Sequence, residues 1–243
     1  MRLDNRKLNE LRTVRIRPEV IRYAEGSVEV EFGNTRVICT ASIDPMVPKW
    51  LSGSGSGWVS AEYGMLPRST HTRISREKAA NSGRTQEISR LIGRSLRAGV
   101  NLKALGERQI QVDCDVVQAD GGTRTAAITG GFVALALALK FLHNQGTLLT
   151  MPLKHYVAAV SVGLMNNEAL LDLNYEEDSA CSTDMNFVIT DKEHFVEVQG
   201  TAEGTTFTKQ QMDEMAVLAT MGCKQLFAKQ AEIIGTFFPI TLA

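Results

Sequence analysis

The sequence predicts an α/β (α+β) fold in which mixed sheets pack against helices and two similar βα halves share one core. Short segments with alternating apolar residues are typical of strands. One longer segment, 125–142, is apolar on nearly every face, which indicates a helix buried at the centre of the protein. A group of strands followed by a helix occurs on both sides of residue 145. We therefore expect one domain, 1–243, with halves of about 1–145 and 146–243.

The N-terminal segment, residues 1–22, carries six arginines and has little apolar periodicity. This composition favours an extended arm that lies on the surface, and the alternative is a solvated terminus. Residues 27–43 alternate around the turn Gly33-Asn34, which predicts a β-hairpin. A loop rich in glycine and serine, 45–57, then leads to a predicted strand at 58–66.

Residues 67–84 contain four arginines among serine, threonine and histidine, without an apolar stripe. We expect a mobile basic loop with RNA or polyphosphate as its natural partner, and the alternative is a solvated charged loop. Residues 85–100 follow as an amphipathic helix with Glu87 in its first turn, where a negative charge suits the helix dipole. Its predicted buried stripe is Ile88, Leu91, Ile92, Leu96 and Val100.

The rest of the chain is organised around residues 109–142. Residues 110–117 alternate as in a strand with one buried face, 119–124 form a turn with two adjacent glycines, and 125–142 form the central helix. The turn therefore brings a threonine and an arginine to the N-terminus of a long buried helix.

This helix start predicts an anion site made by Gly122, Thr123 and Arg124. Free backbone N–H groups and the helix dipole favour an anion there, and the guanidinium of Arg124 matches phosphate oxygens. Arg84 also stands just before a predicted helix and is placed to meet an anion. The alternative is an ordinary strand–turn–helix connection with Arg124 in a structural ion pair.

The C-terminal half begins with two further predicted hairpins. One covers 156–173 and turns at Asn166-Asn167, and the other covers 184–197. The last helix starts at Thr208, which is placed to form a capping box with Gln211. The predicted inner stripe of this helix is Met212, Met215, Ala219, Gly222 and Leu226.

Between these hairpins lies an acidic connection, residues 174–183. Its acids and the next one along the chain fall within nine residues: Glu176, Glu177, Asp178 and Asp184. Carboxylate oxygens are the ligands that Mg²⁺ prefers, so a strand and its preceding loop could hold a divalent cation here. The alternative is an acidic turn that is simply solvated.

Composition indicates a globular protein with 44% hydrophobic and 22% charged residues. The four cysteines are scattered, which argues against a zinc site and for a reducing compartment, so we expect a cytoplasmic protein. No charged-then-apolar leader opens the chain. The longest apolar run, 132–142, contains Lys140 and is too short to span a bilayer, so we expect no membrane partner.

Charge is distributed unevenly along the chain. Residues 1–124 hold 20 Lys+Arg against 14 Asp+Glu, whereas 125–243 hold 6 against 13, and all sixteen arginines lie at or before Arg124. One half would then suit polyphosphate and the other a cation, or two halves or subunits would dock by opposite charge. Both interpretations remain open at this point.

The glycine–helix anion site, the arginine loop and the carboxylates together have the parts needed for phosphoryl transfer. There is no Walker A sequence, which argues against ordinary P-loop nucleotide hydrolysis. None of the four histidines falls in a nucleophile pattern, and no Ser/His/Asp or Cys/His arrangement is visible.

Six stretches carry a resemblance to a known family. They are AEGSVEVEFGNTRVICTAS, GWVSAEYGMLPRSTHTR, GRTQEISRLIGRSLRA, DCDVVQADGGTRTAAITGG, EDSACSTDMNF and EVQGTAEG. In this order they resemble the bacterial ribonuclease PH family of phosphate-dependent 3′-exoribonucleases that trim tRNA precursors, over about residues 15–210.

The resemblance implies a ribosomal-protein-S5-domain-2-like fold and a homohexamer built as a trimer of dimers. It also implies a reaction in which inorganic phosphate attacks the last phosphodiester of an RNA 3′ end and releases a nucleoside diphosphate, with the reverse reaction adding nucleotides. The implied partner is RNA, namely the 3′ ends of tRNA precursors. Mg²⁺ or another divalent cation is the implied cofactor.

The resemblance assigns residues to each role. The family's GTR tripeptide and an arginine of the GRT segment hold the attacking phosphate, and they match Gly122, Thr123, Arg124 and Arg84. The carboxylates that place the metal match Asp178 and Asp184, and these four charged residues form the expected catalytic set; Asp184 is also a candidate general acid. The arginines that hold tRNA match Arg68, Arg73 and Arg76.

Three departures from the family pattern stand out. Asn5 replaces a usual glycine, Asn174 stands where an acidic residue is common, and residues 233–243 do not match the family tail. Two other functions remain as alternatives: a non-catalytic RNA-binding subunit of an exosome-like ring, and a metal-dependent hydrolytic exonuclease. The retained GTR arginine and carboxylates argue against the inactive subunit.

Overall fold

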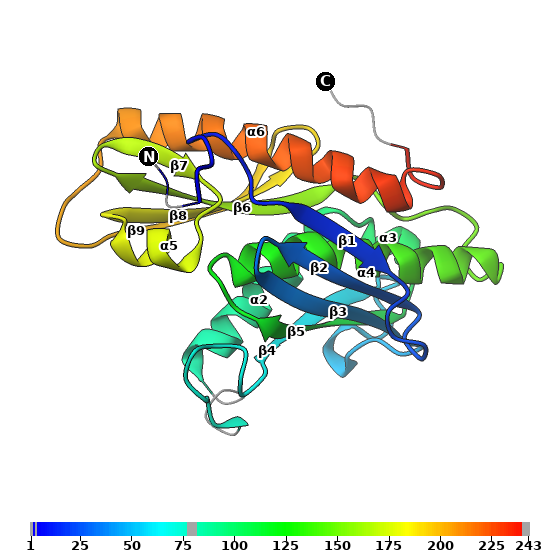
Figure 1. Cartoon of the computed structure of the whole chain (residues 1–243). Helices are drawn as coiled ribbons and strands as arrows, with labels where there is room; N and C mark the ends of the chain where they lie inside the picture. The colour runs from blue at the N-terminus through cyan, green and yellow to red at the C-terminus, as the bar shows by residue number, and fades with distance from the viewer. Residues whose placement is uncertain (1, 3, 77–81, 240–243) are drawn as a thin grey trace.

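The computed structural model describes residues 2, 4–76 and 82–239 (Figure 1). Its N-terminal half contains a five-stranded sheet in the order β1-β2-β3-β5-β4, in which the last pair is parallel and the others are antiparallel. The strands are β1 (Val14–Pro18), β2 (Gly26–Phe32), β3 (Thr35–Asp44), β4 (Trp58–Met65) and β5 (Gln109–Gln118). The predicted hairpin at 27–43 and the strand at 58–66 are confirmed.

The C-terminal half contains a four-stranded antiparallel sheet in the order β7-β6-β8-β9. Its strands are β6 (Val157–Met165), β7 (Glu168–Leu171), β8 (Thr183–Thr190) and β9 (Phe195–Ala202). Both predicted hairpins are present. Asn166 and Asn167 turn the first with positive φ angles of 52° and 63°, which asparagine tolerates better than most residues.

The helices and the two sheets are arranged in layers. Helices α2 (Gly83–Ala98) and α4 (Thr123–Asn144) lie between the two sheets, and α6 (Lys209–Ile234) covers the outer face of the four-stranded sheet (Figure 1). The short elements are the 3₁₀ helix η1 (Lys49–Leu51), α3 (Leu102–Leu105) and α5 (Tyr175–Ala180). The mixed α/β fold with packed helices is therefore as predicted.

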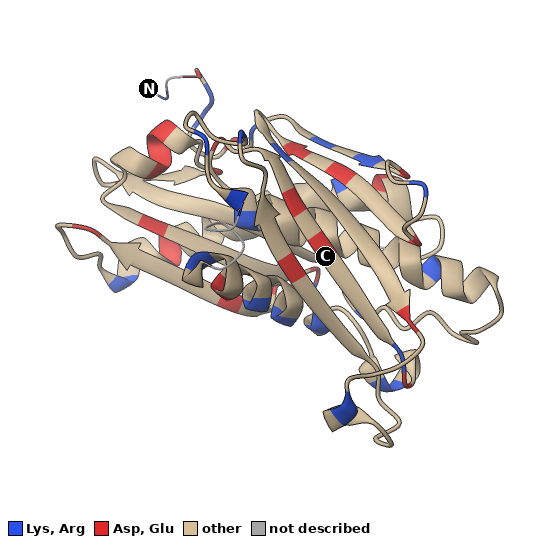
Figure 2. Ribbon diagram, turned by 90° about the horizontal axis from the view of Figure 1, so that it is seen from below, with Lys and Arg blue, Asp and Glu red and all other residues tan. Residues whose placement is uncertain are grey.

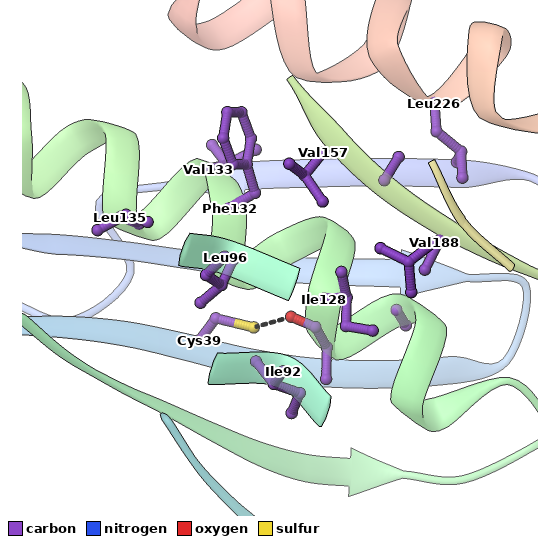
Figure 3. Packing of buried hydrophobic residues seen from close by; sticks show 14 of the residues in the cluster. Cys39, Ile92, Leu96, Ile128, Phe132, Val133, Leu135, Val157, Val188 and Leu226 are labelled. Atoms are coloured by element: carbon purple, nitrogen blue, oxygen red, sulfur yellow. Dashed lines mark hydrogen bonds between the residues drawn. The ribbon is translucent and has the colours of Figure 1, made fainter. Parts of the chain in front are cut away.

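One hydrophobic cluster joins the two halves. Figure 3 shows Cys39 of β3, Ile92 and Leu96 of α2, and Ile128 and Phe132 of α4 in the same packed region as Val157 of β6 and Leu226 of α6. Helix α4 is buried along almost its whole length, as its uniformly apolar sequence predicts. The shared core is therefore built around α4, with one sheet on each side.

Helix α4 is also the one helix in the described ranges that is long and apolar enough to cross a membrane, with 22 residues and a mean hydropathy of 1.8. It is longer than the apolar run 132–142 suggests. However, 83% of its apolar window is buried inside the protein, so here it forms the core between the sheets.

Several sequence expectations need correction. The connection 174–183 is not a plain acidic loop, because it contains α5, and Asn174 caps that helix in a capping box with Glu177. Asn174 therefore caps α5 at a position where the family pattern commonly has an acidic residue. Helix α2 begins at Gly83, so Glu87 lies beyond its first turn. On α6, Met212 is exposed, whereas Met215, Ala219, Gly222 and Leu226 are buried as expected.

The chain ends are packed against the fold where they are described. Asn5 adopts a φ of 64°, which accounts for the preference for glycine at that position. At the other end, the backbone carbonyl of Phe238 accepts a hydrogen bond from the hydroxyl of Tyr156, and their rings stack with centroids 5.3 Å apart. The segment after Ile234 therefore closes the end of α6 over the core.

The charge asymmetry joins the halves within one chain. Arg2 and Arg12 of the N-terminal arm are buried and pair with Glu177 and Asp172 of the acidic half, at 2.6 and 2.7 Å. The arm is thus neither solvated nor only superficial. Figure 2 shows other acidic residues at several positions along the strands. The opposite-charge docking is therefore observed between the halves.

Candidate functional site

The turn between β5 and α4 has a backbone shape that requires glycine. Gly121 and Gly122 have φ angles of 72° and 63°, in the left-handed region. A Cβ atom on Gly121 would lie 2.6 Å from the carbonyl carbon of Asn174, so the space is closed as well. Thr35 braces the turn, since its Oγ1 accepts from Asp120 N at 2.9 Å and donates to Gly121 O at 2.6 Å.

Gly122 is the residue that precedes α4, and it has no side chain to cap the helix. The first backbone N–H groups of α4 are thus left to an external acceptor, and the helix dipole adds positive potential. Thr123 is buried beside this helix start, with its Oγ1 2.8 Å from the hydroxyl of Tyr63. Burial raises the pKa of Tyr63, so its hydroxyl keeps its proton. The predicted anion site therefore has the expected backbone geometry.

Arg124 belongs to a hydrogen-bonded network that joins α4, β9 and α2. Its Nη1 donates to Gln199 Oε1 at 2.5 Å and to Glu87 Oε1 at 3.3 Å, and Gln199 Nε2 donates to Glu87 Oε1 at 2.9 Å. The ion pair left open as an alternative is thus present. It engages one nitrogen, and Nε and Nη2 make no hydrogen bond to a described residue. The guanidinium is oriented and keeps donors for an anion.

Arg84 stands in the first turn of α2, two residues after the cap Ser82, whose Oγ accepts from Thr85 N at 3.1 Å. Its side chain is exposed. Burial raises the pKa of both Tyr63 and Asp178, and the positive charges of Arg84 and Arg124 oppose this rise at each group. The two arginines predicted for phosphate therefore come from different helices and lie close enough to act on the same two side chains.

The two predicted metal carboxylates come from different elements. Asp178 lies on α5 and is exposed, whereas Asp184 lies on β8 and is half-buried. The pKa of Asp178 is raised, first by desolvation and then by the negative charge of Asp184, while Arg84 and Arg124 oppose this shift. The fold thus brings together all four expected catalytic side chains.

This carboxylate pair fits a hard divalent cation. A cation between the two acids relieves their repulsion, and Mg²⁺ is held by one or two carboxylates while it keeps several waters. Within the described residues, no group of three or more histidine, cysteine, aspartate or glutamate side chains forms a metal cluster. Glu177 is unavailable, because it is buried and paired with Arg2 and Arg6. The donors therefore suit Mg²⁺ better than a transition metal.

Arg12 connects the glycine turn, which forms the anion site, to the segment that leads into α5. Its Nε and Nη2 donate to Asp172 at 3.0 and 2.7 Å, and its Nη1 donates to Asp120 O at 2.5 Å. Asp172 leads into α5, which carries Asp178, whereas Asp120 leads into the glycine turn. Burial acts to lower the pKa of Arg12, but the charge and hydrogen bond of Asp172, together with the charges of Asp120 and Glu177, outweigh it and the pKa is raised. One buried cation thus sets the spacing of the acidic helix and the anion turn.

Arg12→Ala is expected to lower the free energy of unfolding by about 3–5 kcal/mol, because the buried Asp172 would keep only the more distant Arg6, at 3.7 Å, as an ion-pair partner. The Asp172 side chain is 0% exposed and that of Arg12 is 5% exposed. Arg12→Lys should recover part of this loss, since lysine keeps the charge but cannot bond both Asp172 and the turn. Urea unfolding measures both.

Arg15→Ala is the matched control, because that side chain is 71% exposed and its pair with Glu31 spans 3.9 Å. It should change stability by no more than about 0.5 kcal/mol. Equal losses for Arg12→Ala and Arg15→Ala would show that the buried arginine does not bind the halves together.

The loop arginines lie at the edge of this region. Arg68, Arg73 and Arg76 are exposed, and none forms an ion pair with a described residue. Arg68 Nη1 donates to His71 O at 3.1 Å, and Arg76 lines a groove beside Tyr63 and Arg90. The basic loop predicted at 67–84 includes residues 77–81, which lie outside the described residues. The three arginines keep their charge available to an anionic ligand.

Four contributors were missed from the sequence: Tyr63, Gln199, Arg12 and Asp172. Each of these residues contacts a partner that is distant in the sequence. Tyr63 and Thr123 are 60 positions apart, Gln199 and Arg124 are 75 apart, and Arg12 and Asp172 are 160 apart. No local spacing rule connects such residues. The only local signal is the alternation of β4, which indicates that Tyr63 is buried.

Known proteins match the chain over nearly its whole length. The family model "3′ exoribonuclease family, domain 1" matches residues 10–140, and the model for domain 2 of the same family matches residues 155–222. Ribonuclease PH of Bdellovibrio bacteriovorus is 61% identical over 240 residues, which cover 99% of each chain.

Solved structures show the same fold at lower identity. A chain of the Archaeoglobus fulgidus exosome with RNA bound to the active site has a TM-score of 0.78 at 23% identity, with 94% of this chain and 92% of that chain covered. Rice (Oryza sativa) Rrp46 has a TM-score of 0.75 at 19% identity, with coverages of 97% and 99%. The sequence matches and the shared fold lead to one assignment: the chain belongs to the ribonuclease PH family of 3′ exoribonucleases.

Proposed function

We propose that the site built from α4, α2, α5 and β8 binds inorganic phosphate and a divalent cation to shorten RNA from its 3′ end. The protein is a 3′-to-5′ exoribonuclease that uses phosphate to trim the 3′ ends of tRNA precursors and releases nucleoside diphosphates. The observation that carries the residue assignment is the convergence of Arg84 and Arg124 on Asp178, next to an uncapped helix start at Gly122.

Phosphate is the nucleophile in this proposal. The N–H groups after Gly122, the hydroxyl of Thr123 and the guanidinium of Arg124 hold it, together with Arg84. A phosphate oxygen forms a bond to the phosphorus of the last phosphodiester, and the bond to the 3′ oxygen of the preceding nucleotide breaks. The two arginines offset the repulsion between the phosphate and the RNA backbone. No side-chain nucleophile is required.

Asp178 and Asp184 are the proposed ligands of a divalent cation. When bound, Mg²⁺ supplies Lewis-acid stabilisation of the negative charge on the phosphorus being attacked. The two carboxylates approach from a helix and a strand, so their spacing depends on how α5 rests on the sheet. Arg2 and Arg12 fasten that helix, and they thereby hold Asp178 toward Asp184.

RNA reaches the site past the loop that carries Arg68, Arg73 and Arg76. These exposed cations match phosphates of the RNA backbone, whose contacts position a strand without reading its sequence. The same loop is anchored to the site, because Ala119 N donates to Ser69 O at 2.8 Å directly before the glycine turn. A strand held by the loop therefore lies next to the phosphate site.

The deciding experiment follows a labelled RNA with and without inorganic phosphate. We expect shortening only with phosphate, and nucleoside diphosphates as the products. Release of nucleoside monophosphates without phosphate would instead identify a hydrolytic nuclease. RNA binding without any shortening, at saturating phosphate and Mg²⁺, would identify a non-catalytic ring subunit.

The assembly proposed for this chain is a homohexamer, a trimer of dimers. A groove lined by Ile21, Tyr23, Leu137 and Phe141 supports self-association, and Tyr23 is 89% exposed there. A single domain over residues 1–243 is proposed because one core cluster includes both halves. The four cysteines are free, which supports a cytoplasmic location.

A further inference from the structure

A groove lies beside Asp120, the residue that directly precedes the two glycines of the turn. Its lining includes Asn34, Arg68, His71, Gln118 and Tyr175, and its volume is about 610 Å³, within the size range of small-molecule sites. It lies between the end of β5, the start of α5 and the arginine loop. Neither the phosphate nor the metal proposal uses this groove.

Tyr175 presents an aromatic surface in this groove. Its side chain is 55% exposed, although tyrosine is large and apolar over most of its area. The ring of His71 lies 6.2 Å away at an interplanar angle of 58°, and Arg68 fixes the loop there by donating to His71 O. Two exposed rings with an arginine beside them form the arrangement that binds unpaired bases by stacking.

The groove is attached to the reaction site. Tyr175 N donates to Asp120 Oδ1 at 3.3 Å, and Asp120 directly precedes the two glycines of the turn. Tyr175 and Asp178 are three residues apart on α5, so they lie on neighbouring positions of one helix face. A nucleotide in the groove is therefore adjacent to one whose phosphate lies at Asp178.

Charge determines which part of a nucleotide fits. Asp120 and Glu176 also line the groove, and their carboxylates repel a phosphodiester. They accept hydrogen bonds from amino groups at the edges of bases, as do the amide oxygens of Asn34 and Gln118. Arg68, at the rim, suits the backbone phosphate instead. The groove is thus matched to a base and its rim to the backbone.

We propose that Tyr175 and His71 stack an unpaired base of the RNA near its 3′ end, while Arg68 holds the adjoining phosphate. This subsite rests on the proposed function. It fixes the register of the strand, because a stacked base stops the RNA from sliding past the scissile bond. It tolerates any base, since every base offers a stacking face.

The test uses single-stranded oligoribonucleotides that carry one abasic residue at successive positions from the 3′ end. For the wild type without phosphate, we expect one position at which the abasic change weakens binding about 10-fold, measured by fluorescence anisotropy. Tyr175→Ala should weaken binding of the intact RNA to a similar extent and abolish the sensitivity at that position. Tyr175→Phe should preserve both affinity and sensitivity.

Kinetics separate stacking from a merely structural contact. Tyr175→Ala should raise the KM for RNA while the KM for phosphate stays unchanged, and His71→Ala should act in the same direction. Trp50→Ala serves as the aromatic control, because Trp50 lies in η1, beside Trp58 at the start of β4, and its side chain is 66% exposed. If the wild type bound intact and abasic RNAs equally at every position, the stacking subsite would be overturned. It would also be overturned if Tyr175→Phe lost the abasic sensitivity as completely as Tyr175→Ala. Absence of any phosphate-dependent shortening by the wild type would instead count against the proposed function.

Discussion

Asp184→Asn is expected to lower the rate of phosphorolysis by about 10³-fold while the protein folds and binds RNA. The substitution removes a negative charge from the pair that Asp184 forms with Asp178, and the remaining carboxylate holds a divalent cation poorly. Loss of one group that stabilises developing charge in an active site costs roughly 10²–10³ in turnover, and loss of the cation costs more. Neither Asp178 nor Asp184 is a member of the buried core cluster, so stability should change little.

Measurement of kcat over a titration of Mg²⁺ checks this expectation. If the substitution mainly weakens metal binding, the kcat of Asp184→Asn would recover partly at high Mg²⁺. If Asp184 acts only in the chemical step, kcat would stay low throughout. Either result agrees with a position of Asp184 at the reacting phosphate. Glu203→Gln is the control, since that exposed carboxylate lies just beyond β9. Wild-type turnover in Asp184→Asn would place the metal elsewhere in the protein.

Arg124→Ala is expected to lower kcat/KM for phosphate by about 10²-fold and to leave RNA affinity nearly unchanged. The Arg124 side chain is only 16% exposed and is oriented by Gln199 and Glu87, so its free donors meet an anion at little entropic cost. Without it, the helix start at Gly122 and Arg84 must hold phosphate alone. The expected sign is a steep rise in the phosphate requirement.

Initial rates over a wide range of phosphate concentrations, at saturating RNA, give the required parameters. Arg124→Lys keeps the charge without the planar fork and should fall between the wild type and Arg124→Ala. Arg15→Ala removes an exposed arginine from β1 and should match the wild type. An unchanged phosphate KM in Arg124→Ala would exclude Arg124 from the phosphate site and leave its ion pair with Glu87 as its only role.

The fold was predictable where the pattern is local. Alternation over 27–43 and 58–66 and the uniformly apolar α4 identified strands and the buried helix, because burial of one face or of all faces is written into consecutive residues. The acidic connection at 174–183 was not recognised as α5. Six residues are too few for a helical period, and the cap pair Asn174 and Glu177 is its only local signal.

The site was predictable to the extent that its residues sit in short motifs. Gly122, Thr123 and Arg124 are consecutive, and Arg84 precedes a recognisable helix, so the anion site could be drawn from the chain. The roles of Asp178 and Asp184 came from the family resemblance, since acidic residues before a strand have no distinctive spacing. Arg12 and Gln199 escaped both routes, because their contacts are made across 160 and 75 positions of sequence.

The sequence by itself determined most of the strands and helices, the glycines of the turn and the residues proposed to bind phosphate. Those properties depend on side-chain type and on neighbours along the chain, which the sequence states directly. Tertiary structure alone decided that the arm's arginines are buried against Asp172 and Glu177, and that Asp178 on α5 lies close enough to Asp184 on β8 for the two charges to interact. Contacts of this kind join residues far apart in sequence, and the burial of the whole shared core stabilises them.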